Sequence, residues 1–100
     1  MSYSVAFAPE ALAQLDALEG YISENGTPLL AARFIDNIVS YCENLCVFPL
    51  RGARRDDLLT GLRITHYRRT TVIAFLVDTS AEAVLNLGIF HGGQDYSTHL

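Results

Sequence analysis

The spacing of apolar residues changes at Gly61, and this change limits the folds that are open to the chain. Between residues 9 and 46, apolar residues recur every three or four positions, which is typical of amphipathic helices. From residue 62 to residue 90 they follow the two-residue period of strands or form a short continuous run. Helical residues first and strand residues afterwards predict an α+β fold.

Two prolines mark the starts of the predicted helices. Pro9 and Pro28 suit the first turn of a helix, where the missing N–H costs nothing, and Thr27 supplies an N-cap oxygen. Asn25-Gly26 is expected to end the first helix, and Phe48-Pro49 to close the second. Because the connection between the helices is short, we expect a helical hairpin.

Four strands are predicted, one before the helices and three after them: residues 3–7, 62–67, 71–78 and 83–90. The order is β-α-α-β-β-β, which predicts a helical hairpin packed on one face of a mostly antiparallel four-stranded sheet. The two-residue period places Arg63, Thr65 and Tyr67 on the face opposite to Leu62 and Ile64.

Length and composition predict one domain that works with a partner. One hundred residues suffice for a single core, so residues 1–100 are expected to form one domain. Half of the residues are hydrophobic and the mean hydropathy is +0.22, which is high for a chain whose small size leaves much of it at the surface. We therefore expect exposed apolar surface that a protein partner covers.

The sequence contains no apolar run long enough to span a bilayer, and residues 1–20 lack the order of a signal peptide. A cytoplasmic protein without membrane contact is expected. Cys42 and Cys46 lie four positions apart, and no second pair of Cys or His completes a metal set. They are interpreted as reduced thiols that pack in the core, and no metal or cofactor is expected.

Almost all of the positive charge lies in one segment. All seven basic residues are arginine, and six of them fall between positions 51 and 69. The rest of the chain is acidic and the net charge is −4, which is the wrong sign for a protein that depends on phosphate contacts. Sequence-specific nucleic-acid binding is therefore not expected, although a local basic patch can still hold an anion.

Four short motifs, in this order and spacing, resemble the RelE/ParE toxin superfamily of bacterial toxin–antitoxin modules. They are Tyr3-x-Val5-x-Phe7-x-Pro9-Glu10-Ala11, Phe48-Pro49-x-Arg51-Gly52, Gly61-Leu62-Arg63 and His91-Gly92-Gly93-Gln94-Asp95. The resemblance covers nearly the whole chain and is stronger to the ParE branch, whose toxins poison DNA gyrase, than to the RelE branch, whose toxins cut mRNA on the ribosome. It implies a toxin that a cognate antitoxin holds inactive in a hetero-oligomer.

The resemblance directs the choice of candidate binding residues. Antitoxin contact is expected along an anion-binding edge and along the apolar stripe of the first helix: Arg51, Arg54, Arg55, Arg63 and Tyr67, with Leu15, Leu18 and Ile22. For Arg63, the structural interpretation is an ion pair with Asp56 or Asp57 of the same chain, or with an acid of the partner. Gyrase contact is tied by the resemblance to the C-terminal segment, here Gln94, Asp95 and Tyr96.

The alternative function is a ribosome-dependent mRNA endoribonuclease of RelE type. Cleavage of RNA needs a base, a cation for the charged intermediate and an acid, and Arg63, His91 and Tyr96 are the residues that could supply them. The acidic balance of the chain weakens this alternative. His91 also follows the parity of Leu87 and Ile89, which favours a structural imidazole at a strand end. No catalytic residue is expected in the favoured function.

Overall fold

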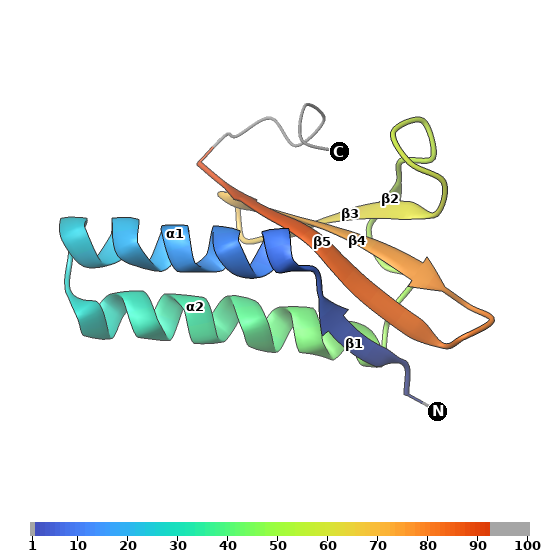
Figure 1. The fold of residues 1–100 in the computed structure, drawn as a ribbon, viewed down its shortest axis with the longest axis horizontal. Coiled ribbons are helices and arrows are strands. Elements are labelled where there is room, and N and C mark those ends of the chain that lie inside the picture. Colours follow the sequence, from blue (N-terminus) through green and yellow to red (C-terminus); the bar gives the residue numbers. More distant parts are fainter. Residues whose placement is uncertain (1, 93–100) are drawn as a thin grey trace.

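The computed structural model describes residues 2–92, in which two helices and five strands form two layers (Figure 1). The helices are α1 (Pro9–Asn25) and α2 (Pro28–Glu43), and a short 3-10 turn, η1 (Asn44–Cys46), follows α2. The strands are β1 (Ser4–Phe7), β2 (Ala53–Arg54), β3 (Leu62–Tyr67), β4 (Thr71–Asp78) and β5 (Ala83–His91). The predicted α+β class and the predicted helical hairpin are confirmed.

The sheet has five strands in the order β1-β5-β4-β3-β2, one more than the four predicted. β1 runs parallel to β5, and the other neighbours are antiparallel. The additional strand, β2, pairs Ala53 with Ile64 and Arg54 with Arg63 at the sheet edge. It was missed because two residues are too few to show an alternating pattern.

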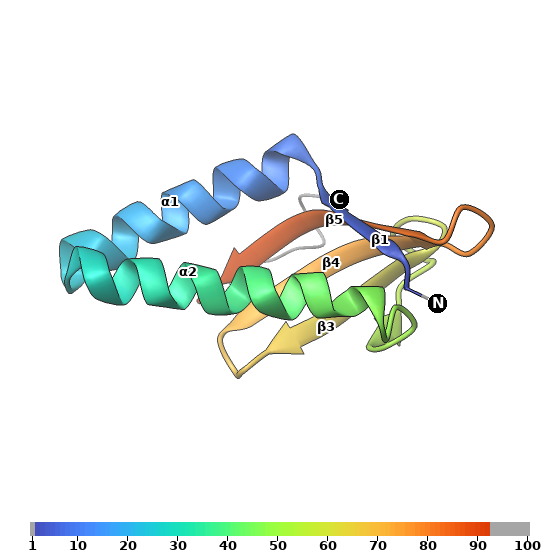
Figure 2. The ribbon, with the colours of Figure 1, turned by 90° about the horizontal axis from the view of Figure 1, so that it is seen from below.

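The helix starts and the end of α1 follow the residues that predicted them, whereas α2 ends at Glu43, before the predicted Phe48-Pro49, because the chain tightens into η1. Both helices begin at a proline, and the Oγ1 atom of Thr27 accepts a hydrogen bond from the backbone N–H of Leu30 at 3.2 Å. α1 packs against β5, and α2 lies across β4 and β3, so the hairpin covers one face of the sheet (Figure 2). The end of the hairpin that joins the two helices projects beyond the sheet (Figure 1).

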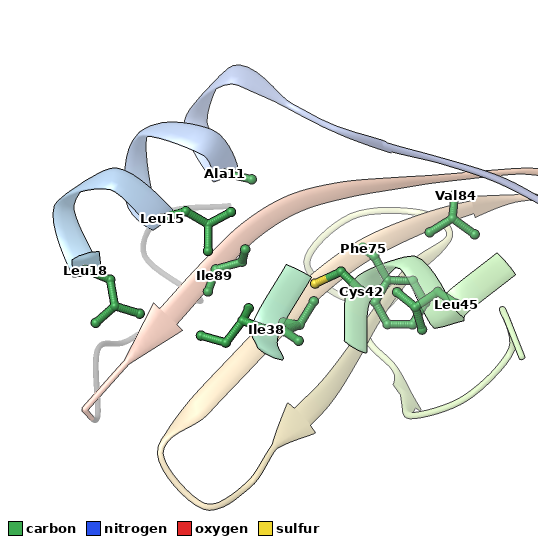
Figure 3. Packing of buried hydrophobic residues seen from close by; sticks show 10 residues of the cluster. Ala11, Leu15, Leu18, Ile38, Cys42, Leu45, Phe75, Val84 and Ile89 are labelled. Carbon is green, nitrogen blue, oxygen red and sulfur yellow. The ribbon is translucent and has the colours of Figure 1, made fainter. Parts of the chain in front are cut away.

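The main core lies between the hairpin and the sheet. Ile38, Cys42 and Leu45 point from α2 and η1 toward Phe75 of β4, and all four are fully buried (Figure 3). Burial raises the pKa of the Cys42 thiol to about 12, so the thiol is protonated and packs as a small apolar group. The predicted core position of Cys42 is confirmed, while Cys46 is half-buried.

A second, smaller apolar cluster lies on the other face of the sheet. Leu62, Ile64, Ala74 and Phe90 are buried there, and Leu58 covers them from the segment that follows β2. The predicted alternation of side chains between the two faces along β3 therefore holds. The face that carries Arg63, Thr65 and Tyr67 is the one that the helices cover, so it is not a polar surface. Thr65 and Tyr67 lie beneath α2, where the Thr65 hydroxyl is 3.1 Å from that of Tyr41.

On the side away from β4, the end of β5 has no neighbouring strand. β1 pairs only with residues 83–86, and beyond them Gln14 of α1 accepts a hydrogen bond from the backbone N–H of Ile89 at 2.7 Å. A β-bulge opposite Ala74 and Phe75 shifts the register of β5. Next to it, the ring of Phe90 lies over Gly88, where an added Cβ would stand 2.6 Å from the ring.

A pair of glycine-to-alanine substitutions tests this packing. Gly88→Ala is expected to lower the free energy of unfolding by about 1–3 kcal/mol, because the buried Phe90 ring has no room to move. Gly20→Ala, within α1, meets no neighbouring side chain within 4 Å and is expected to raise that free energy by about 0.5–1 kcal/mol. Urea denaturation of the two variants measures both values, and equal effects would contradict the packing described.

Candidate functional site

The arginine-rich segment neutralises part of its own charge. Arg54 pairs with Asp56 and Arg55 pairs with Asp57, each with nitrogen and oxygen 2.9 Å apart. A hydrogen bond from the Gly61 N–H, together with the charge of Arg54, holds the pKa of the Asp56 carboxyl below its ordinary value. Arg55 likewise lowers the pKa of Asp57. The segment after β2 therefore presents no net positive charge.

Arg63 holds the connection that leads into β2. Its Nη1 atom lies 3.4 Å from the carbonyl oxygens of both Arg51 and Gly52, one strand away. No ion pair joins Arg63 to Asp56 or Asp57, which pair with Arg54 and Arg55, although the charge of Arg63 contributes to the lowered pKa of Asp56. Gly52 has a φ of +80°, and any Cβ there would collide with the carbonyl oxygen of Ile64. Arg63 thus acts within the fold.

Two other arginines lie over aromatic rings at the flank between α2 and β3. The guanidinium of Arg51 is 5.2 Å from the ring centroid of Tyr41 and 5.6 Å from that of Phe48. Tyr41 packs edge-on against Tyr67 at 5.3 Å, and Arg68 lies 5.4 Å from Tyr67. Such cation–π contacts orient a guanidinium without neutralising it. Arg51 and Tyr67, both predicted to bind the partner, belong to this row.

The apolar residues predicted to bind the partner face inward. Leu15 and Leu18 are buried between α1 and the sheet, and Ile22 packs against the same core while half-buried. A helical stripe alone does not show whether it meets the sheet or a partner. Within residues 2–92, the large apolar side chains that are exposed are others, and none of them was predicted to bind the partner: Leu12, Tyr21, Leu29, Leu30, Val47, Phe48, Leu50, Leu59 and Leu85.

His91 ends β5 in a structural setting. Its Nδ1 atom is 3.1 Å from the Thr71 hydroxyl, and its ring packs edge-on against Phe34 with centroids 5.6 Å apart. It borders a groove of about 440 Å³ between α1 and β5, which Gln14 and Tyr21 also line. The other C-terminal candidates, Gln94, Asp95 and Tyr96, lie outside the described residues.

The sheet register separates Arg63 from His91. Arg63 is level with Phe75 and Asn86, whereas His91 is level with Thr71 and Tyr67, four residues further along β3. At about 3.3 Å per residue this offset is about 13 Å, and the two positions also stand two strands apart, which adds about 10 Å across the sheet. These two members of the possible ribonuclease site are not brought together.

Residues 2–92 also offer no evident metal site. Within them, no group of three or more His, Cys, Asp or Glu side chains gathers at one place. No helix in the same residues has both the length and the apolar character to cross a membrane.

A matched pair of variants distinguishes an arginine that holds the backbone, Arg63, from an arginine in a surface ion pair, Arg54. Arg63→Gln is expected to lower the free energy of unfolding by about 1–2 kcal/mol, because a charged donor to two carbonyl groups is lost. Arg54→Gln, at the register partner of Arg63, removes an exposed ion pair and is expected to change it by less than about 0.5 kcal/mol. Urea denaturation measures both, and a loss in the Arg54 variant as large as in the Arg63 variant would refute the role given to Arg63.

Comparison with known proteins identifies the family. The family profile described as the ParE toxin of the type II toxin–antitoxin system parDE matches residues 5–96. No curated protein sequence matches the chain. A chain of the chromosomal ParDE system from P. aeruginosa superimposes with a TM-score of 0.76 at 23% identity, covering 91% of this chain and 97% of that one.

Two further solved structures share the fold. A chain of the toxin–antitoxin complex RelBE2 from Mycobacterium tuberculosis gives a TM-score of 0.68 at 22% identity, covering 94% of this chain and 95% of that one. A substituted E. coli toxin RelE in the free state gives 0.68 at 12% identity, covering 99% and 93%. These structural similarities confirm the two-layer fold, and the match to the family profile identifies the family. The chain belongs to the ParE toxin family of type II toxin–antitoxin systems.

Proposed function

We propose that this toxin inhibits DNA gyrase and that a cognate antitoxin holds it inactive in a hetero-oligomer. The observation that carries the proposal is the match of residues 5–96 to the ParE family, the branch in which the sequence resemblance implies poisoning of gyrase. In this function the toxin binds gyrase in the cytoplasm and stabilises its cleaved complex with DNA. It performs no chemistry of its own.

The position of the possible catalytic groups supports binding over RNA cleavage. General acid and base groups must reach one scissile phosphate within hydrogen-bond distance. Arg63 instead donates to the carbonyl groups of Arg51 and Gly52. His91 lies beside Thr71, and its position in the sheet is four residues and two strands away from that of Arg63. The net charge of −4 is also unfavourable for a protein that must bind ribosomal RNA.

Two observations support an antitoxin partner. The structural neighbours include chains from a ParDE system and from the RelBE2 toxin–antitoxin complex. In addition, nine large apolar side chains are exposed in the part of the toxin that the structure describes. A disordered antitoxin segment that folds on binding must bury such surface to offset the entropy it loses.

The contact with gyrase is assigned to Gln94, Asp95 and Tyr96. This part of the proposal rests on the resemblance to the ParE branch, in which inhibition is tied to the C-terminal segment. A toxin shortened after Gly93 therefore serves as the matched control in any assay of gyrase.

Assays with purified components test the proposed function. The full-length toxin is expected to inhibit supercoiling by gyrase and to increase the amount of cleaved DNA, while leaving in vitro translation unchanged. The toxin shortened after Gly93 is expected to lose this inhibition, and its unfolding midpoint is measured alongside to show that it folds.

The opposite pattern would overturn the proposal. Inhibition of translation with gyrase unaffected would favour the RelE-type endoribonuclease. In that case, substitution of Arg63, His91 or Tyr96 should abolish mRNA cleavage. Unchanged gyrase activity together with unchanged translation would identify a non-toxic family member.

A further inference from the structure

The connection between η1 and β2 carries a concentration of exposed apolar side chains. Val47 is 57% exposed, Phe48 60% and Leu50 57%. Together with Pro49 and Arg51 they line a shallow hollow of about 400 Å³. We call these five consecutive residues, 47–51, the 47–51 patch. It occupies the bend at which the chain leaves the helical layer and enters the sheet.

The backbone on both sides of the patch is held in place. The N–H groups of Val47 and Phe48 donate to the carbonyl of Asn44, at 3.1 and 3.5 Å. At the other end, Arg63 donates to the carbonyl of Arg51. The exposed side chains therefore stand on a fixed backbone, which lowers the conformational entropy that a binding partner must overcome.

Arg51 gives the patch an oriented positive charge. Its guanidinium lies over the rings of Tyr41 and Phe48. Among residues 2–92 no carboxylate pairs with it, in contrast to Arg54 and Arg55, which are paired with aspartates. A guanidinium stacked on a ring keeps the N–H groups at its edge available for a two-point contact with a carboxylate.

We propose that the 47–51 patch binds an acidic, amphipathic peptide segment of the antitoxin, a step that rests on the proposed function. Large apolar side chains of the peptide fill the hollow beside Phe48 and Leu50, and one of its carboxylates pairs with Arg51. Apolar contact supplies most of the affinity, whereas the Arg51 pair selects acidic peptides and fixes their position.

The chemistry of the patch favours this occupant over a nucleic acid. A bound nucleic acid needs several cations spaced along its phosphates, and Arg51 is the only basic residue of the patch. Three of the five patch residues are large, exposed and aliphatic or aromatic, which suits the apolar face of a folded peptide.

Selection from a displayed library of random twelve-residue peptides tests the proposal without knowledge of the antitoxin. The full-length toxin is the target, and the variants Phe48→Ser and Arg51→Glu serve for counter-selection. The enriched peptides are expected to combine net negative charge with two or more large apolar residues. A fluorescent copy of one such peptide then gives affinities by anisotropy.

Matched substitutions elsewhere in the chain provide the controls. Phe48→Ser and Arg51→Glu are each expected to weaken peptide binding by about tenfold or more. Leu29→Ser removes a side chain that is equally exposed, at 61%, but lies at the tip of the hairpin, and Arg33→Glu reverses an exposed charge on α2, outside the patch. Both should bind within about twofold of the unmodified toxin, a change too small to mark a contact residue. Unfolding midpoints confirm that all four variants fold.

Several results would overturn the proposal. These are failure to enrich any peptide that depends on Phe48, enrichment of basic peptides, or equal losses with Leu29→Ser. Binding of a single-stranded oligonucleotide that Arg51→Glu abolishes would assign the patch to nucleic acid. Self-association that Phe48→Ser abolishes would assign it to a second copy of the chain. None of these results depends on the gyrase assays, so the patch and the proposed function fail separately.

Discussion

The packing of α2 on the sheet is the interaction on which the other features depend. Ile38 and Cys42 are buried against Phe75, and this contact fixes where the remaining side chains of α2 lie. Tyr41, one position before Cys42, meets Tyr67 at the flank of the sheet and carries Arg51 on its ring. The same buried contact thus provides the core and orients the positive charge of the surface.

The arginine-rich segment serves mainly the structure of the toxin. Arg54 and Arg55 are paired with neighbouring aspartates, and Arg63 fixes the backbone at residues 51 and 52. The two ion pairs offset two of the six arginine charges of the segment. Arg51, which lies beside exposed apolar side chains, keeps its charge available. This arrangement suits recognition of a protein better than contact with a nucleic acid.

The sequence predicted the features that depend on local chemistry. Pro9, Pro28 and Thr27 place the helix starts correctly, and the apolar period predicts the strands after Gly61. It did not predict contacts between distant residues. The partners of Arg63 are backbone carbonyl groups eleven and twelve residues away, which no side-chain pattern marks. The sequence also does not show what covers the apolar stripe of α1. Burial by a sheet and burial by another protein need the same apolar residues, so the stripe is predicted to bind a partner although it packs on the sheet.

The claim that this toxin acts by binding and not by cutting RNA is tested most directly in cells. After brief expression of the toxin, DNA ends and RNA 5′ ends are sequenced from the same culture. We expect new DNA ends that remain covalently attached to gyrase, with the pattern of mRNA ends unchanged. New mRNA 5′ ends that follow the codon register, with no new DNA ends, would contradict the claim.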